Sequence, residues 1–381
     1  MKFAQALTVL SLAGASLAQG QFFNGKYTQS NANTLDTAVA AGGQNGRDPS
    51  VKTLLGLASP YSNVTDALKG DNTILLAPSD SAFEKALAMP GVADAVKNAT
   101  TLTSVLQYHV IPNTPLDVNQ TAGSHVYRTA AGLPIKINSQ NGEVTITSSP
   151  KNTAKVVEYV ATTNGEILVL DSVLFPPENA STTLGQLELK ALADLATKLN
   201  LVQTLDGFQN VTIFAPNDAA FQAIQSTAAG LTPETLTQIV TLHIVQGIYY
   251  AEDIVKAKNA TVPTALQNYA IQATLSGDGK VQALPVPAPA NAKAATVVSA
   301  DNLFKGGVIH IVDAVLIPQI GDNGNVTIPT TLAPAAATTM SATPTPTGTT
   351  AGGNSGAGVS AKVGVAGLVG GIVAAVAVLV L

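Results

Sequence analysis

The pattern of hydrophobic and polar positions along the chain contains two short apolar runs, each followed by a proline. Residues 73–77 and residues 211–215 are rich in aliphatic and β-branched side chains, which predicts buried β-strands. A polar residue follows each proline, Ser79 in one case and Asn217 in the other, where a helix needs a side-chain N-cap. Each run is therefore expected to be a strand that leads directly into a helix.

The residues after these caps fit the first turn of a helix. Asp80 and Asp218 place a negative charge where it interacts favourably with the helix dipole. Ser79, Asp80, Asn217 and Asp218 are therefore expected to be structural helix caps. A pair of aspartates could also suggest glycoside hydrolysis, but these two occupy the same position in two similar segments, which disfavours a shared cleft.

Helical and strand patterns follow in the same order after each cap. Residues 100–107 carry aliphatic side chains at helical spacing, and Pro233 stands at the first position of a comparable helix. The dipeptides Asn-Gly at 141–142 and Asp-Gly at 278–279 separate alternating runs, which predicts tight hairpin turns. Helices and one strand thus precede a run of strands, an order typical of the α+β class.

Four patterns occur twice in the same order, and this internal repeat is the most informative feature of the sequence. The copies lie about 138 residues apart, as position 221 does from position 83. This spacing is too long for a solenoid unit and indicates two separate globular domains in tandem. The matched blocks are residues 73–83 and 211–221, 106–111 and 240–245, 141–142 and 278–279, and 167–176 and 309–318.

The repeated blocks resemble the conserved boxes of the fasciclin domain family. Residues 77–80 and 215–218 are similar to its first box, and residues 308–313 are similar to its terminal strand. The resemblance implies an α+β fold with two tandem fasciclin-type domains, each a wedge of mostly antiparallel β-strands flanked by helices. It also implies a secreted or membrane-anchored protein of the adhesion or matrix type. The expected domains are residues 48–178 and 179–319, after an N-terminal segment at residues 19–47.

The Tyr-His box of this family is complete only in the first domain. Tyr108 and His109 match it, whereas the second domain has Leu242 before His243. In animal relatives the box is associated with integrin-dependent adhesion, so Tyr108, His109 and His243 are the candidate adhesion residues. Because both histidines lie among apolar residues, the alternative is a buried imidazole that satisfies hydrogen bonds inside its own domain. Neither histidine has a second ligand at metal-binding spacing, which disfavours a metal site.

The N-terminus has the pattern of a secretory signal peptide. In residues 1–18 a lysine precedes an apolar stretch, and small residues occupy the cleavage positions. Seven Asn-x-Ser/Thr sequons support a secreted glycoprotein. The candidate N-glycosylation sites are Asn63, Asn98, Asn119, Asn179, Asn210, Asn259 and Asn325.

The C-terminal region has the parts of a glycosylphosphatidylinositol (GPI) signal. Residues 320–354 are rich in Thr, Ala and Pro with almost no charge, which predicts an extended, O-glycosylated stalk. Residues 355–381 are expected to be a GPI propeptide, with attachment at Asn354, or at Gly353 or Ser355. A retained transmembrane helix is the alternative.

Composition excludes several other functions. Charged residues make up only 11% of the chain, and the net charge of −5 disfavours nucleic acid as a partner. Cysteine is absent, which excludes disulfides, thiolate metal sites and cysteine nucleophiles. No Gly-x-Ser-x-Gly motif occurs in the two domains, which disfavours a serine hydrolase.

These features together predict a non-enzymatic, GPI-anchored glycoprotein of the cell surface that acts in adhesion or in the cell wall or matrix. Its expected partners are surface, matrix or wall components, either protein or polysaccharide, and the membrane through a lipid anchor; no cofactor is expected. A carrier of a lipid or small hydrophobic ligand is an alternative, because the chain is poor in charge and rich in aliphatic residues. A vacuolar destination and a secreted hydrolase are further alternatives, and the second is disfavoured by the lack of a catalytic triad.

Overall fold

A computed structural model describes residues 26–42, 50–114, 123–290, 292–321, 325–329 and 338–339. The described residues divide into two compact units. The first contains those up to Asn179 together with Leu303–Lys305, and the second contains the others from Ala180 onward. The expected signal peptide, GPI attachment residues and propeptide, and most of the stalk, lie outside the described residues.

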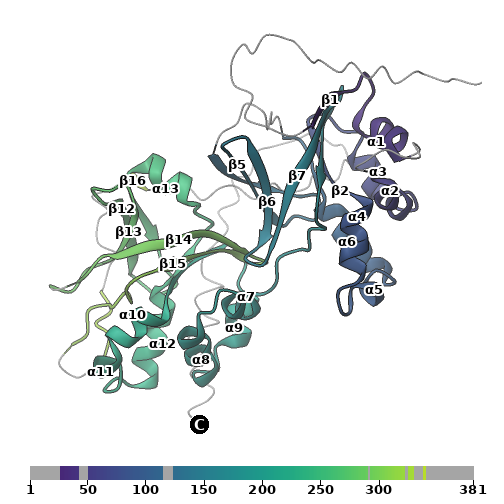
Figure 1. The fold of residues 1–381 in the computed structure, drawn as a ribbon. Coiled ribbons are helices and arrows are strands. Elements are labelled where there is room, and N and C mark those ends of the chain that lie inside the picture. The colour runs from purple at the N-terminus through teal and green to yellow at the C-terminus, as the bar shows by residue number, and fades with distance from the viewer. Residues whose placement is uncertain are drawn as a thin grey trace, which may run out of the picture. The chain divides into compact units, whose positions relative to one another are not determined.

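The first unit places its helices on one side of its strands (Figure 1). The helices are α1 (Thr34–Gly42), α2 (Lys52–Ala58), α3 (Ser62–Ala67), α4 (Asp80–Leu87), α5 (Val92–Ala95) and α6 (Ala99–Tyr108). The strands are β1 (Lys26–Gln29), β2 (Thr73–Pro78), β3 (Val110–Ile111), β4 (Gly123–Arg128), β5 (Pro134–Gln140), β6 (Glu143–Ser149), β7 (Asn152–Ala161) and β8 (Gly165–Leu170).

The second unit repeats this order of elements, with one more helix before its strand run. The helices are α7 (Ala180–Gln186), α8 (Lys190–Lys198), α9 (Val202–Gly207), α10 (Asp218–Ala223), α11 (Gln225–Ala228), α12 (Pro233–Leu242) and α13 (Ala251–Ala257). The strands are β9 (Val211–Pro216), β10 (Ile244–Gln246), β11 (Asn259–Pro263), β12 (Ala270–Leu275), β13 (Val281–Val286), β14 (Ala295–Phe304), β15 (Gly307–Val312) and β16 (Thr338–Thr339).

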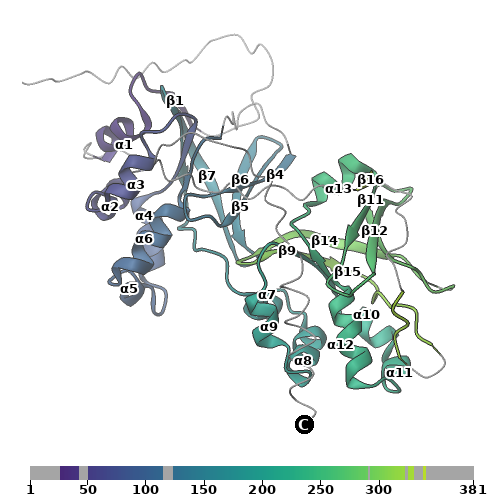
Figure 2. The same ribbon diagram turned by 180° about the vertical axis from the view of Figure 1, so that it is seen from behind.

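The two sheets share one strand order. It is β3-β2-β8-β7-β6-β5-β4 in the first unit, with β1 paired to β7, and β10-β9-β15-β14-β13-β12-β11-β16 in the second (Figure 2). Near one edge of each sheet the pair β2 with β8, or β9 with β15, is parallel, and so are β1 with β7 and β11 with β16, while the hairpin-connected strands are antiparallel. The predicted α+β class and the tandem duplication are therefore confirmed.

The predicted strand-to-helix junctions are also confirmed. Every residue of β2 and β9 is buried, as expected for apolar runs that form interior strands of a sheet. The Ser79 hydroxyl accepts a hydrogen bond from the N–H of Ala82, and the Asn217 side chain accepts one from Ala220, so both residues are N-caps. Each cap satisfies a backbone donor that the first turn of a helix leaves without an intrahelical partner.

The two predicted hairpin turns differ in length. Gln140 pairs with Glu143 across Asn141-Gly142, which is the tight two-residue turn expected, and both turn residues have positive φ. In the second unit Leu275 pairs with Val281, and the N–H of Ser276 donates to the carbonyl oxygen of Lys280, so residues 277–279 form a loop that is one residue longer. Of the Asp278-Gly279 dipeptide only the glycine has positive φ. A tight turn is present, but it is centred on Gly277 and Asp278, one residue earlier than expected, because the N–H of Gly279 donates to the carbonyl oxygen of Ser276 at 2.9 Å.

A glycine begins the last long strand of each unit because the neighbouring backbone comes very close. Gly165 in β8 pairs with Thr73, and Gly307 in β15 pairs with Val211. A Cβ atom at either glycine would lie 1.9 Å from the carbonyl oxygen of its partner. Only glycine fits at these two positions without a shift of the backbone.

The first unit contains two apolar clusters. One lies between the helices and the sheet and includes Leu54, Phe83 and Leu106, and the other is formed mainly by strand residues such as Ile135 and Ile146. The helix α1 belongs to the first cluster through Ala38, and β1 pairs with β7. Both elements precede residue 48, so the first unit includes part of the N-terminal segment.

Candidate functional site

The histidine of the repeated box has the same buried position in both units. His109 follows α6 and is 1% exposed, and His243 follows α12 and is 5% exposed. The Nδ1–H of His109 donates to the carbonyl oxygen of Val105 at 2.8 Å, and its Nε2 accepts from the N–H of Leu174 at 3.1 Å. The ring therefore joins the end of a helix to the segment that follows the last strand of its unit.

The second histidine repeats these contacts with its own neighbours. His243 Nδ1–H donates to the Ile239 carbonyl oxygen at 2.7 Å, and its Nε2 accepts from the N–H of Leu316 at 2.9 Å. Burial lowers the pKa of His109 and that of His243 to about 4. Both rings are neutral near pH 7, which is the state that one donated and one accepted hydrogen bond requires.

Tyr108 is also buried, and its hydroxyl is used inside the first unit. The side chain is 0% exposed, and the hydroxyl donates to the carbonyl oxygen of Pro134 at 2.7 Å. Burial raises the pKa of this tyrosine. In the second unit Leu242 fills the position with an apolar side chain that is equally buried. In this conformation the candidate adhesion residues Tyr108, His109 and His243 present no side chain to a receptor. The two histidines have the internal hydrogen-bonding role that was their alternative interpretation, and the Tyr108 hydroxyl is also bound inside its unit.

The two helix-start aspartates each hold the start of a second helix. Asp80 Oδ1 accepts from the N–H of Thr53 in α2 at 2.7 Å, and Asp218 Oδ1 accepts from the N–H of Ala191 in α8 at 2.9 Å. Burial by itself would raise the pKa of Asp80, but hydrogen bonds from Ser50 and Thr53 stabilise the carboxylate and lower the pKa below its usual value. The two carboxylates thus bind backbone groups of their own units, a connection that helix periodicity did not predict.

A third histidine has a structural position in the second unit alone. His310 in β15 is 1% exposed; its Nε2–H donates to the carbonyl oxygen of Tyr249 at 2.8 Å, and its Nδ1 accepts from the N–H of Asp301 at 3.2 Å. Asp301 Oδ1 in turn accepts from the N–H of Ala251, the first residue of α13. This network attaches the additional helix to the sheet.

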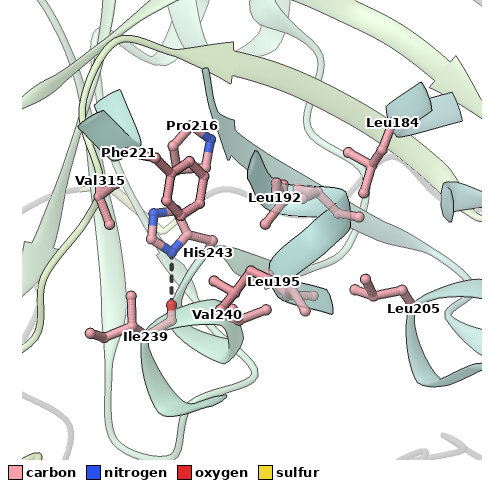
Figure 3. A pocket seen from close by; sticks show the side chains of 12 residues that line it. Leu184, Leu192, Leu195, Leu205, Pro216, Phe221, Ile239, Val240, His243 and Val315 are labelled. Carbon is pink, nitrogen blue, oxygen red and sulfur yellow. Dashed lines mark hydrogen bonds between the residues drawn. The ribbon is translucent and has the colours of Figure 1, made fainter. Parts of the chain in front are cut away.

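The helical layer of the second unit encloses a small apolar cavity (Figure 3). Its volume is about 20 Å³, which is close to the space that one water molecule needs. In Figure 3 the His243 ring lies beside Phe221, with Leu192 and Leu184 across the space. Val240 of α12 also lines it, at the position where the first unit has Leu106. The cavity is too small for an acyl chain unless the helices around it separate.

Two larger apolar grooves lie at the surfaces of the units. One, of about 330 Å³, is lined by residues of α1, α2 and α3, among them Val39 and Leu55. The other, of about 370 Å³, lies in the second unit and is lined by residues that include Ile224 and Ile317. Their size is in the range of small-molecule sites, so a hydrophobic ligand has more room there than in the enclosed cavity.

The sequons differ in accessibility. Asn63, Asn210 and Asn325 are exposed. Asn98 is exposed as well, and its side-chain oxygen caps α6 by accepting from the N–H of Thr101. The half-buried sequon residues are Asn179 and Asn259, and Asn119 lies outside the described residues.

The described residues contain neither a cluster of metal ligands nor a membrane-spanning helix. Among these residues, no group of three or more His, Asp or Glu side chains is placed to hold a metal ion. None of the helices that the structure describes is both long and apolar enough to cross a membrane.

Comparison with known proteins matches both units. The fasciclin domain model matches residues 49–176 and 187–318. A fasciclin-like arabinogalactan protein of Arthroderma benhamiae is 25% identical over 283 residues, which cover 68% of this chain and 63% of that protein. The chain therefore spans less than two thirds of that relative. An immunogenic protein of Mycobacterium bovis is 29% identical over 143 residues, which are 37% of this chain and 68% of that protein.

A solved structure is similar to this chain as well. It is the FAS1 domain pair of the insect cell adhesion molecule fasciclin I, with a TM-score of 0.34 and 18% sequence identity. The match covers 73% of this chain and 99% of that one.

Proposed function

This chain belongs to the fasciclin domain family, and on that premise we propose that it is a GPI-anchored cell-surface glycoprotein that acts in adhesion or in contact with the wall or matrix. The signal-peptide pattern of residues 1–18, the Thr/Pro-rich composition of residues 320–354 and the small residues at 353–355 support the anchoring. The fungal relative, a fasciclin-like arabinogalactan protein, supports the surface location. The proposal assigns no catalytic activity and no cofactor.

One observation carries this proposal: the polar groups of the repeated boxes bind their own domain. His109, His243, Asp80 and Asp218 each accept from a backbone N–H of their own unit. Because these groups form hydrogen bonds that stabilise their own unit, a partner would bind to the exposed surfaces of the two units. Contacts of this kind are weak singly and gain strength when many copies are displayed on one cell.

The anchoring is tested on intact cells that express the full chain with an epitope tag inserted before residue 26. We expect phosphatidylinositol-specific phospholipase C to release the tagged protein into the medium. The control variant replaces Gly353, Asn354 and Ser355 by bulky residues, which prevents attachment, so phospholipase should release none from these cells. Retention of the unmodified protein after treatment, together with survival of a C-terminal tag, would show that the anchoring proposal is wrong.

The adhesion function is tested with the released protein. We expect it to bind cells or isolated wall material, and we expect cells without the protein to adhere less. The carrier of a lipid or small hydrophobic ligand is the second candidate, and the apolar grooves in the two units favour it. A stoichiometric lipid detected by native mass spectrometry, without binding to cells or walls, would favour the carrier.

A further inference from the structure

The chain that follows the last long strand of the second unit returns to that unit as a small antiparallel hairpin. Ile320 and Val326 form an isolated antiparallel bridge, and the N–H of Thr327 donates to the carbonyl oxygen of Gln319 at 2.8 Å. The start of the region expected to be a stalk therefore contacts the second unit. The described residues of this segment, which we call the clasp, are 319–321 and 325–329.

One buried side chain of the second unit binds both strands of the clasp. Tyr269 is 1% exposed, and its hydroxyl donates to the carbonyl oxygen of Thr327 at 2.9 Å and accepts from the N–H of Gln319 at 3.1 Å. The neighbouring residue adds a third bond, because the Nδ2 of Asn268 donates to the carbonyl oxygen of Pro329 at 2.6 Å. Polar side chains of the unit thus bind the backbone of the clasp at both strands.

The clasp also supplies an apolar side chain to the core of the second unit. Val326 is 8% exposed and belongs to the apolar cluster that includes Tyr269 and Ile271. Ile328, two residues further along, is 39% exposed. Of these two aliphatic residues, only Val326 therefore attaches the clasp by burial.

The first unit has the same loop without the groups that hold a clasp. Leu133, which precedes β5, stands where Tyr269 precedes β12, and Gly132 stands where the second unit has Asn268. The match is supported by the backbone, since Gly132 and Asn268 both have positive φ. Neither leucine nor glycine has a side chain that can bind a backbone carbonyl. The fold alone therefore does not require the Asn-Tyr pair, which occurs in the unit nearer the C-terminus.

We propose that the clasp takes up tension from the C-terminal anchor and opens before the sheet of the second unit is loaded. This inference rests on the proposed GPI anchoring, because an anchored protein that binds a partner through its units is pulled from its C-terminal side. Opening would lengthen the tether while both units stay folded, and closing would restore the contacts of Tyr269 and Val326.

The order of contacts along the chain supports this role. Tension from the C-terminus first meets β16, which pairs with β11 over two residues, and next meets the clasp. The two strands of the clasp are then pulled apart from their open end, so its hydrogen bonds are loaded one after another. The strand before the clasp is β15, which pairs with β9 along all six of its residues. The clasp is thus the weaker of these two contacts and should open first.

The test pulls single molecules of the full-length chain in magnetic tweezers. One handle is attached to a tag inserted before residue 26, and the other to the cysteine of Ser355→Cys, which is unique because the chain has no cysteine of its own. We expect a reversible step of up to about 3.5 nm, the length of ten extended residues, at a lower force than unfolding of either unit. With the second handle at Gln319→Cys, an exposed position before the clasp, this step should be absent.

Two matched pairs of variants test the contacts. Tyr269→Phe removes the hydroxyl and should raise the ratio of open to closed clasp about tenfold at a given force, since one hydrogen bond contributes about twofold to tenfold. Its control is Tyr249→Phe in the same cluster, where the hydroxyl bonds to no other described residue, and the ratio should change less than twofold. Val326→Thr, which buries a hydroxyl, should also raise the ratio about tenfold, whereas Ile328→Thr at the exposed position should not.

The outcomes separate this inference from the proposed function. A step of equal size with the handle at Gln319→Cys would overturn the inference, because the extension would then come from another part of the chain. Equal ratios for Tyr269→Phe and Tyr249→Phe, or unfolding of a unit without an earlier step, would overturn it as well. All of these results leave the phospholipase test of anchoring unaffected. If phospholipase fails to release the protein from cells while the step is observed, the anchoring proposal is wrong and the clasp still opens under load.

Discussion

The buried histidine of the repeated box makes the stability of each unit depend on pH, and His243→Gln in the full-length chain tests this. The His243 ring is 5% exposed and links the Ile239 carbonyl to the Leu316 N–H. Glutamine can offer one donor and one acceptor but does not titrate. At pH 7 the variant should lose about 1–3 kcal/mol, the cost of a buried group whose hydrogen bond is not fully replaced.

The magnitude of the pH effect follows from the pKa. Burial lowers the pKa of His243 from 6.5 to about 4. Between these values the unfolded chain binds more protons than the folded chain, so the stability present above pH 6.5 is lost as pH falls towards 4. A decrease from pH 7 to pH 5 should cost the second unit about 2 kcal/mol, since one pKa unit corresponds to about 1.4 kcal/mol.

Hydrogen–deuterium exchange with peptide-level mass spectrometry reports the two units separately. In the unmodified chain, peptides of both units should lose about 2 kcal/mol of protection free energy between pH 7 and pH 5, after correction for intrinsic exchange. In His243→Gln the second unit should lose about 2 kcal/mol less, while the first unit, which keeps His109, is unchanged. The reciprocal variant His109→Gln should reverse the pattern. Identical pH dependence of the second unit with and without His243 would refute the reasoning.

Three further predictions concern packing and caps. Val240→Leu gives the second unit the side chain that Leu106 supplies in the first unit. The added methylene should fill the cavity and raise the unfolding free energy of the second unit by about 0.8 kcal/mol, measured by thermal denaturation. In urea titrations Gly165→Ala should destabilise the first unit by about 3 kcal/mol, because a Cβ atom there would collide with the neighbouring backbone. Gly56→Ala in α2 should instead stabilise this unit by up to about 1 kcal/mol, because nothing lies near the added Cβ atom and alanine favours a helix over glycine. Ser79→Ala should cost about 1 kcal/mol in the same titrations, because the N–H of Ala82 loses its acceptor.

Each of these predictions has an outcome that contradicts it. A lower melting temperature for Val240→Leu would mean that the cavity cannot accept the added methylene. Equal effects of alanine at Gly165 and Gly56 would show that the close approach of β2 and β8 does not constrain the chain. An unchanged urea midpoint for Ser79→Ala would show that the Ser79 cap contributes no measurable stability.

Local sequence patterns were enough to predict the strand-to-helix junctions. A cap such as Ser79 and the turn at Asn141-Gly142 depend on residues within three or four positions, and those residues are visible in the sequence. At Asp278-Gly279 the same argument placed the turn one residue too late, because the hydrogen bond from the N–H of Gly279 to the carbonyl oxygen of Ser276 centres it on Gly277 and Asp278. Strand register, set by the core-facing residues, decided where the turn lies.

By itself, the sequence determined the duplication, the α+β class and the helix starts, because these follow from periodicity and from contacts between near neighbours. The tertiary structure alone decided what the polar residues of the boxes do: His109 binds Leu174, 65 residues away, and Asp80 binds Thr53 of another helix. Hydrogen bonds between distant segments depend on how the chain packs, and no local pattern encodes that packing.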